Sequence, residues 1–295
     1  MESARCKAFL ESVRGGSFKA AADTLGYTPS GVSQLVTALE KELGFTLLVR
    51  TKKGVRPTRE GEQMLPVIRS YLSKERDLYA RASELCGLTV GSLTIASYPS
   101  IAINWLPKLV RRFQKDYPGI HINIKEGIRQ EIFHHLDSGE ADMGFLAYAD
   151  PMPYEWIPLA EDDMLAILPE NHRLAGAPAF PVRACDGESF IMTSWGEDAE
   201  IHEIFRQYQV KPDIRYTTYD TLVAMSMIQM GLGISFMNTL STALIREHLV
   251  KLPLDPPSRI TFGVAVPSEE HLSSAAKKFL DYAVRILTRE ESPAE

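Results

Sequence analysis

SFKAAADTLGYTPSGVSQLVTALEKELG, residues 17–44, reads as two short helices joined by a tight turn. Ser17 is suited to cap the first helix, and Gly26 to end it, since glycine readily adopts the left-handed conformation found after a helix. Thr28 and Pro29 then form a second start signal, a capping hydroxyl followed by proline at the first helical position. The stretch therefore predicts two helices packed across a turn.

Two helices across a turn of three to four residues that contains glycine form the helix-turn-helix pattern. In that motif the start of the second helix enters the DNA major groove, where hydroxyls and amides bond to base edges and phosphates while acids are repelled. A plain helical hairpin in a small bundle is the alternative interpretation. The predicted DNA contacts on these helices are Ser17, Thr28, Pro29, Ser30, Ser33, Gln34 and Thr37.

A basic segment follows, FTLLVRTKKGVRPT over residues 45–58, which predicts two short strands around a turn. Such a ribbon beside a recognition helix suits contact with phosphates or the minor groove. Residues 1–87 hold 14 of the 32 Lys and Arg residues and 10 of the 38 Asp and Glu residues, a balance of +4, which leaves 18 and 28 and a balance of −10 for the remainder. This asymmetry suggests that one end faces a polyanion. The predicted DNA contacts in the wing are Arg50, Lys52, Lys53 and Arg56.

A series of spaced residues runs in one register from Phe9 and Gly16-Ser17-Phe18 through Leu43-Gly44 to Gly61. With this series, residues 1–65 resemble the winged helix-turn-helix of LysR-type transcriptional regulators. The family usually has Phe where Leu48 stands, and Leu48 is expected to pack in its place. The resemblance implies sequence-specific binding to an interrupted palindrome near a promoter, as a homodimer or homotetramer. The residues that carry it, in one register, are Phe9, Val13, Gly16, Ser17, Phe18, Ala21, Ala22, Leu25, Ser33, Leu39, Glu40, Leu43, Gly44, Leu47, Arg50, Thr58 and Gly61.

Residues 58–86 read as a long helix that leaves this small domain. An apolar stripe on such a helix needs a partner. The resemblance implies that the partner is the same helix of a second subunit, and packing onto its own domain is the alternative. Pro66 departs from the family and is expected to kink the helix or delay its regular start. The stripe is formed by Leu65, Ile68, Leu72, Tyr79 and Ala82.

From Gly91 the pattern changes to alternating strands and helices, which predicts a parallel, doubly wound sheet. Two α/β lobes joined by crossing strands resemble the effector domain of the same family, which is similar to periplasmic binding proteins. The fold class is therefore an N-terminal all-α, winged helix-turn-helix domain plus an α/β, periplasmic-binding-protein-like, two-lobed effector domain. The expected boundaries are 1–58 for DNA binding, 59–87 for the linker (dimerisation) helix and 91–295 for effector binding, with lobe I at about 91–160 and 266–290, lobe II at about 161–265, and crossings near 159–162 and 263–266.

Ligands of such folds bind outside the carboxyl ends of the strands, between the lobes. Ser100 stands where the family usually has a Ser or Thr that meets the effector. Its hydroxyl and the nearby backbone N–H groups suit a carboxylate, so an anionic small molecule is one expectation. The predicted effector contacts are Ser97, Tyr98, Ser100, Gly127, Arg129, Phe145, Thr193, Ser194, Trp195 and Tyr219.

Enzymatic and redox functions find no support in the sequence. It contains no G-x-x-x-x-G-K-[ST] and no G-x-S-x-G, and no nucleophile–base arrangement is recognisable. The adjacent His134 and His135 point about 100° apart on a helix and cannot easily share a metal. Cys185 is the only cysteine of the second half, which excludes a disulfide switch within that domain. We expect no catalytic residue, cofactor or metal.

The start of the chain does not resemble a secretory signal, and no run of about 18 apolar residues occurs. The sequence therefore predicts a cytoplasmic protein without a membrane partner. A solute-binding or transport component would explain residues 91–290 but not the first 87, and a metabolic enzyme is the third class. Retention on DNA in a salt-sensitive manner would favour the regulator, and turnover of a ligand would favour the enzyme.

Overall fold

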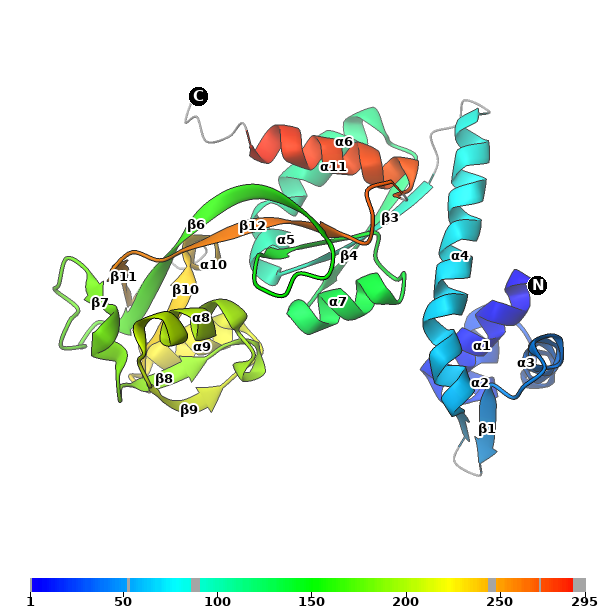
Figure 1. Cartoon of the computed structure of the whole chain (residues 1–295), viewed down its shortest axis with the longest axis horizontal. Coiled ribbons are helices and arrows are strands. Elements are labelled where there is room, and N and C mark those ends of the chain that lie inside the picture. The colour runs from blue at the N-terminus through cyan, green and yellow to red at the C-terminus, as the bar shows by residue number, and fades with distance from the viewer. Residues whose placement is uncertain (1, 52–53, 86–90, 244–247, 271, 289–295) are drawn as a thin grey trace.

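A computed structural model of the 295-residue chain describes residues 2–51, 54–85, 91–243, 248–270 and 272–288. Figure 1 shows a small helical domain at the N-terminus, a long helix α4 that leaves it, and a larger two-lobed α/β part. Within the described ranges no helix is long and apolar enough to cross a membrane. The predicted contacts Lys52 and Lys53 lie outside these ranges.

Three helices and a two-stranded wing form the N-terminal domain, and its helix caps are those expected from the sequence. Ser17 Oγ accepts a hydrogen bond from Ala20 N, and Thr28 Oγ1 accepts one from Gly31 N, each at 3.1 Å. Pro29 occupies the first turn of the third helix, as predicted. The elements are α1 (Ser3–Gly15), α2 (Phe18–Leu25), α3 (Pro29–Leu43), β1 (Leu48–Thr51) and β2 (Gly54–Pro57).

One carboxylate joins the third helix to the wing. Glu40 Oε1, on α3, accepts hydrogen bonds from the backbone N–H groups of Leu47 at 2.7 Å and Leu48 at 3.0 Å. On the other strand, a Cβ at Gly54 would lie 2.1 Å from the carbonyl oxygen of Gly16, so only glycine fits. The wing is thereby held in a fixed position beside α3.

Helix α4 (Arg59–Leu85) continues without interruption through Pro66, so its regular start is not delayed. The predicted apolar stripe divides into two parts. Ile68 and Leu72 are buried in the core of their own domain, because the first half of α4 packs on it. For these two residues the expectation of a second subunit as partner was wrong. Further along, Leu78 is 67% exposed.

The two lobes are joined by two long strands, β6 (Glu155–Pro169) and β12 (Arg259–Val266), which pair along their length (Figure 1). Lobe I contains β3 (Gly91–Ser97), α5 (Pro99–Asn104), α6 (Leu106–Asp116), β4 (Ile120–Glu126), α7 (Arg129–Asp137), β5 (Met143–Ala147) and α11 (Ser274–Leu287). Lobe II contains β7 (Phe180–Pro181), η1 (Val182–Cys185), β8 (Ser189–Met192), η2 (Ser194–Gly196), α8 (Ala199–Tyr208), β9 (Asp213–Thr217), α9 (Thr221–Gln229), β10 (Ser235–Asn238), α10 (Thr239–Thr242) and β11 (Leu249–Asp255).

The prediction of a parallel sheet is confirmed for β3, β4 and β5 and for the pair β8 and β9, but the sheet that continues through β12 and β6 is mixed. β3 pairs in parallel with β4 and β5, but β12 is antiparallel to both β5 and β6. The reason is that β6 leaves lobe I and β12 returns to it, so the two must run in opposite directions. Because residues 262–265 of β12 already pair with β5 inside lobe I, the return crossing precedes the predicted 263–266.

Pro107 lies just after the break between the two helices α5 and α6. Trp105 separates α5 from α6, and its ring packs edge-on against Phe262, 5.5 Å between centroids. Proline has no N–H to continue the helical bonding and disfavours a helical residue before it. The short α5 is therefore a separate helix whose axis need not follow that of α6.

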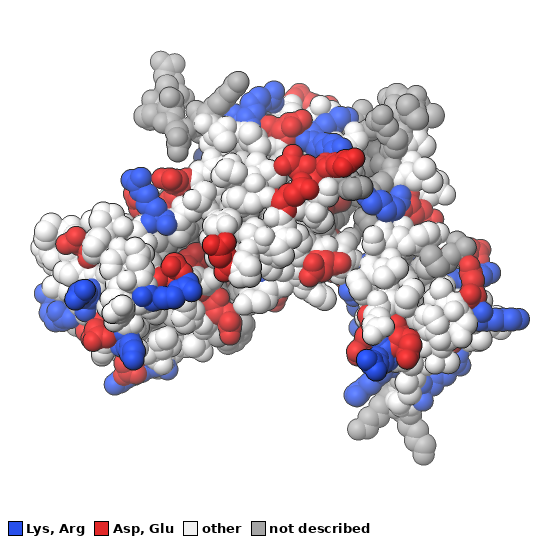
Figure 2. Space-filling view, viewed as in Figure 1, with Lys and Arg blue, Asp and Glu red and all other residues white. Residues whose placement is uncertain are grey.

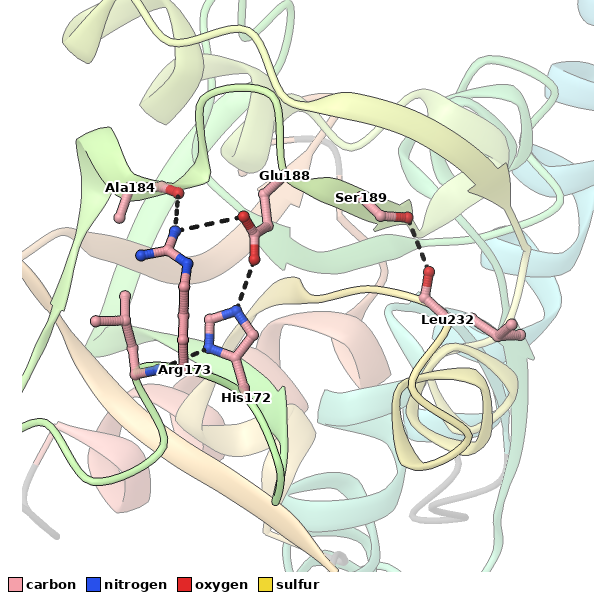
Figure 3. A network of polar contacts seen from close by, with 7 residues as sticks. His172, Arg173, Ala184, Glu188, Ser189 and Leu232 are labelled. Atoms are coloured by element: carbon pink, nitrogen blue, oxygen red, sulfur yellow. Dashed lines mark hydrogen bonds and ion pairs between the residues drawn. The ribbon is translucent and has the colours of Figure 1, made fainter.

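A polar network fastens the loop after β6 to the rest of lobe II (Figure 3). Leu174 N donates to His172 Nδ1 at 3.2 Å, so Nε2 carries the ring hydrogen and donates to Glu188 Oε1 at 2.7 Å. Arg173 bonds to the other Glu188 oxygen at 3.4 Å. Burial opposes ionisation of Glu188, but these hydrogen bonds outweigh it and hold its pKa below the usual value. The network is structural in character.

We predict that Glu40→Ala lowers the free energy of unfolding by about 2 kcal/mol, because two backbone N–H groups lose the carboxylate that accepts from them. Urea denaturation of the full chain measures this difference. Glu60→Ala, at an exposed position of the first turn of α4, serves as control and should change stability by less than about 1 kcal/mol. Equal effects of the two substitutions would contradict the assigned role of Glu40.

Candidate functional site

The start of α3 presents polar side chains to solvent. Ser30, Gln34 and Thr37 are exposed, and Ser33 is half-buried. Thr28 caps the helix and its hydroxyl lies 3.1 Å from that of Ser30. These side chains form one polar face at the end of the helix that a DNA groove would meet.

The predicted contact Arg50 is tied to the helix pair. Its Nη2 donates to Thr37 Oγ1 at 3.0 Å, and its guanidinium lies 5.1 Å from the centroid of the Phe18 ring. Arg56, on the neighbouring strand, is exposed. Ser17 instead acts as the cap of α2. Figure 2 shows Lys and Arg side chains on several sides of this domain.

A cavity of about 330 Å³ lies between the two lobes. Its walls come from the ends of strands and the starts of helices, as the fold predicts. Of the ten predicted effector contacts, six line it: Tyr98, Ser100, Gly127, Thr193, Ser194 and Tyr219.

Three other predicted contacts do not line this cavity. Ser97 is fully buried, and its hydroxyl donates to the carbonyl oxygen of Tyr98 at 3.0 Å. Phe145 is also fully buried and packs against Phe279 in the core of lobe I. Arg129 lies behind the wall, where it is paired with a residue of the other lobe. The side chain of Trp195, the tenth, is outside what the structure describes.

Several lining residues were not anticipated from the sequence. Two of them, Asp198 and Asp220, cap α8 and α9, and Asn238 caps α10. The available signal was an Asp or Asn directly before each of these helices, whose starts face the cleft. The unanticipated polar residues are Asn104, Glu126, Asp198, Glu200, Asp220, Thr221, Asn238 and Ser241.

Polar contacts cross the cleft from lobe to lobe. Arg129 Nη2, at the start of α7, donates to Glu200 Oε1 of α8 at 2.9 Å, and Tyr98 OH donates to the same oxygen at 3.1 Å. The side chains of Arg129 and Glu200 are only 11% and 9% exposed. Tyr219 OH of lobe II donates to Glu131 Oε2 of lobe I at 2.8 Å. These contacts hold the lobes together around the cavity.

Asp198 is an unusually basic carboxyl group in the cleft wall. Burial, and then the neighbouring carboxylate of Glu200, raise the pKa of Asp198 to about 7. Its oxygens accept hydrogen bonds from Thr193 Oγ1 at 2.7 Å and from Ile201 N at 3.2 Å, which only partly offsets this effect. Burial and the same Glu200 carboxylate also raise the pKa of Tyr98 well above its usual value, so its hydroxyl remains a hydrogen-bond donor.

Two family models match separate parts of the chain. Residues 4–62 match the family model "Bacterial regulatory helix-turn-helix protein, lysR family", and residues 87–287 match "LysR substrate binding domain". The uncharacterized HTH-type transcriptional regulator YvbU of Bacillus subtilis is 30% identical, over 98% of this chain and 100% of its own.

Solved structures share the fold. A full-length OxyR variant from Pseudomonas aeruginosa is similar with a TM-score of 0.73 at 19% identity, covering 98% of this chain and 96% of its own. The effector binding domain of QuiR in complex with shikimate is similar with a TM-score of 0.63 at 22% identity, covering 68% of this chain and 98% of its own.

We predict that Asp198→Asn makes the protein relatively more stable as pH rises. A carboxyl group whose pKa is raised from 3.8 to about 7 on folding stabilises the folded state at low pH, and this contribution is lost between about pH 4 and pH 7. The free energy of unfolding of the variant minus that of the wild type should be about a few kcal/mol larger at pH 8 than at pH 4.5. Asp220→Asn, at another helix cap, is the control. A constant difference across this pH range would contradict the assignment.

We also predict that Glu200→Met destabilises the folded chain by about 3 kcal/mol, because it leaves the buried Arg129 charge without its partner. Adding Arg129→Met should recover most of this loss, since the guanidinium also has Nε and Nη1 buried without a hydrogen-bond partner in the described structure. Denaturant unfolding of the single and double variants tests this. Glu203→Met, which removes an exposed ion pair with Arg206 on the same helix, should cost at most about 1 kcal/mol.

Proposed function

This chain belongs to the family of LysR-type transcriptional regulators, and we propose that it reads a promoter site with α3 and the wing while a small molecule held between the lobes alters that binding. We further propose the division into residues 1–58, 59–87 and 91–295 for these tasks, in the cytoplasm and with no catalytic role.

One observation carries the proposal for DNA reading: the exposed hydroxyls and amide at the start of α3, held beside a basic wing. Gln34 is the longest of these side chains, and a glutamine amide can form a bidentate contact with adenine in the major groove. Arg56 on the wing is placed for phosphate contact, which adds affinity without specificity. The polar face would read the bases and the wing would supply the charge.

Two copies of the chain would bind together. Val67 is 56% exposed and Leu78 is 67% exposed, both on α4 and both turned away from the core of its own domain. Apolar side chains along a projecting helix favour pairing with a second helix. A symmetric dimer presents two copies of α3 and therefore suits an interrupted palindrome. A tetramer would be built from two such dimers.

The cavity supports the proposal for a small-molecule effector. At about 330 Å³ it has the size of a metabolite site, and polar groups from both lobes converge on it. QuiR, which shares the fold, has an effector binding domain whose structure was solved in complex with shikimate. An effector can shift the balance between two arrangements of the lobes only in proportion to its difference in affinity for them.

Helix α7 offers a route from the cleft to the DNA-binding end. It begins with Arg129, which holds lobe II, and just after its end Glu140 Oε1 lies 3.5 Å from Arg69 Nη2 of α4. Glu140 Oε2 is in turn fixed by Lys125 at 2.7 Å and by His135 at 3.0 Å. A change in the position of lobe II would move α7, and through Glu140 would change the angle of α4.

Retention of genomic DNA fragments by the purified full-length protein at physiological salt tests the DNA-reading role. We expect a few palindromic promoter fragments to be enriched. Gln34→Ala should reduce the preference for these fragments over random DNA by about 1–3 kcal/mol, because one base contact is lost. Gln63→Ala, an exposed position on α4, is the control. A Gln34→Ala variant with full specificity would reject the base contact, and no enrichment by the wild type would count against the function itself.

A further inference from the structure

The cleft between the lobes is acidic. Figure 2 shows red side chains where the two lobes meet. Among the described residues that line the cavity, none is Lys, Arg or His. Four lining residues are carboxylic acids: Glu126, Asp198, Glu200 and Asp220. Glu200 is paired with Arg129 and the pKa of Asp198 is raised to about 7, so the negative charge that the walls present to a ligand comes mainly from Glu126 and Asp220.

Three helix starts at the lobe interface are occupied by the chain's own carboxylates, whereas the start of the six-residue α5, beside Ser100, has no side-chain cap. Glu131 Oε2 accepts from Ile128 N at the start of α7, at 2.9 Å. Asp198 caps α8, and Asp220 Oδ1 accepts from Leu222 N at the start of α9, at 2.7 Å. An anionic ligand at these three starts would have to displace the carboxylates or sit beside them, and like charges in a partly buried site repel strongly.

The positive charge behind the cavity wall is buried: the side chain of Arg129 is 11% exposed, and its Nε and Nη1 are buried without a hydrogen-bond partner among the described residues. Arg129 Nη2 is engaged by both Glu200 Oε1 and the carbonyl oxygen of Ala147, at 2.9 and 2.8 Å. By contrast, some carboxylate oxygens of the cleft accept no hydrogen bond from the described residues. Toward the described residues, the carboxylate of Glu126 makes no hydrogen bond, and Asp220 uses only Oδ1. The described part of the cleft thus has no accessible cation and has unused anionic acceptors on both lobes.

We propose that the effector of this cleft carries a positive charge, as an aliphatic amine does, with Glu126 of lobe I and Asp220 of lobe II as the residues that bind its ammonium groups. This inference rests on the proposed function of the cleft as the effector site. It replaces the sequence-based expectation of an anion at Ser100. Ile103, Leu222 and Ile260 supply apolar lining for the carbon chain. A ligand that bridges the two carboxylates would tie the lobes together.

Matched ligands test the sign of the charge. Isothermal titration of the full-length protein at pH 8 with 1,4-diaminobutane, butanedioate and 1,4-butanediol compares three four-carbon chains that differ only in their end groups. We expect the diamine to bind and to raise the melting temperature, and the diacid not to bind. Tighter binding of the diacid, or no binding by any linear diamine of three to six carbons, would overturn the inference.

Two substitutions locate the site. Glu126→Gln and Asp220→Asn keep the shape of each side chain and should each weaken diamine binding at least about tenfold, because one charge-assisted contact is lost. Glu203→Gln, on the outer face of α8 and away from this cavity, is the matched control and should leave the affinity unchanged. Equal losses for all three variants would indicate attraction to the acidic surface in general and would reject the site.

Operator retention in the presence of each compound separates this inference from the proposed function. If the diamine binds in the cleft and retention of the enriched fragments changes, the positively charged effector and the regulatory role of the cleft are both supported. If it binds without any change in retention, the charge preference of the cleft stands and the regulatory role of the cleft fails. If the diacid changes retention instead, the regulator stands and the positive effector is wrong.

Discussion

The arrangement of the effector domain depends on one buried ion pair, Arg129 of α7 with Glu200 of α8. Each charge has lost most of its hydration, so separating the lobes without rehydrating them would leave two uncompensated charges. The hydroxyl of Tyr98 adds a second bond to the same carboxylate. Lobe position is therefore set by a contact that is strong when intact and costly when half-broken, which favours two discrete arrangements over a continuum.

Through the same ion pair, α7 connects lobe II to α4. This helix of nine residues is about 13 Å long, and it carries the interlobe contact at its first residue and is followed by Glu140, the contact of α4. A helix of this length moves as a rigid body. A small displacement of its first residue would therefore also displace its far end, beside Arg69 of α4.

Local signals in the sequence predicted much of the N-terminal domain, since caps such as Ser17 and Thr28 and the turn glycines act within a few residues of themselves. The effector site was harder. Ser97 and Phe145 were assigned to it from their strands, but which side of a strand faces the cleft depends on helices far away in the sequence, such as α11 with Phe279. Asp198 and Asp220 escaped notice because an N-cap next to a cleft looks in sequence like any other N-cap. The direction of β12 could not be predicted because it depends on the return from lobe II.

Lobe I is assembled from two separated pieces of chain. Leu93, Ile95 and Phe113 precede lobe II in the sequence, and Phe262 and Phe279 follow it. All five pack together in the core of lobe I. In chain order the described strands of lobe II that precede the return crossing end at Asp255, and β12 and α11, which complete lobe I, follow them. The core of lobe I, and with it the cleft, can therefore close only after β12 and α11 have been added to a chain that already contains lobe II.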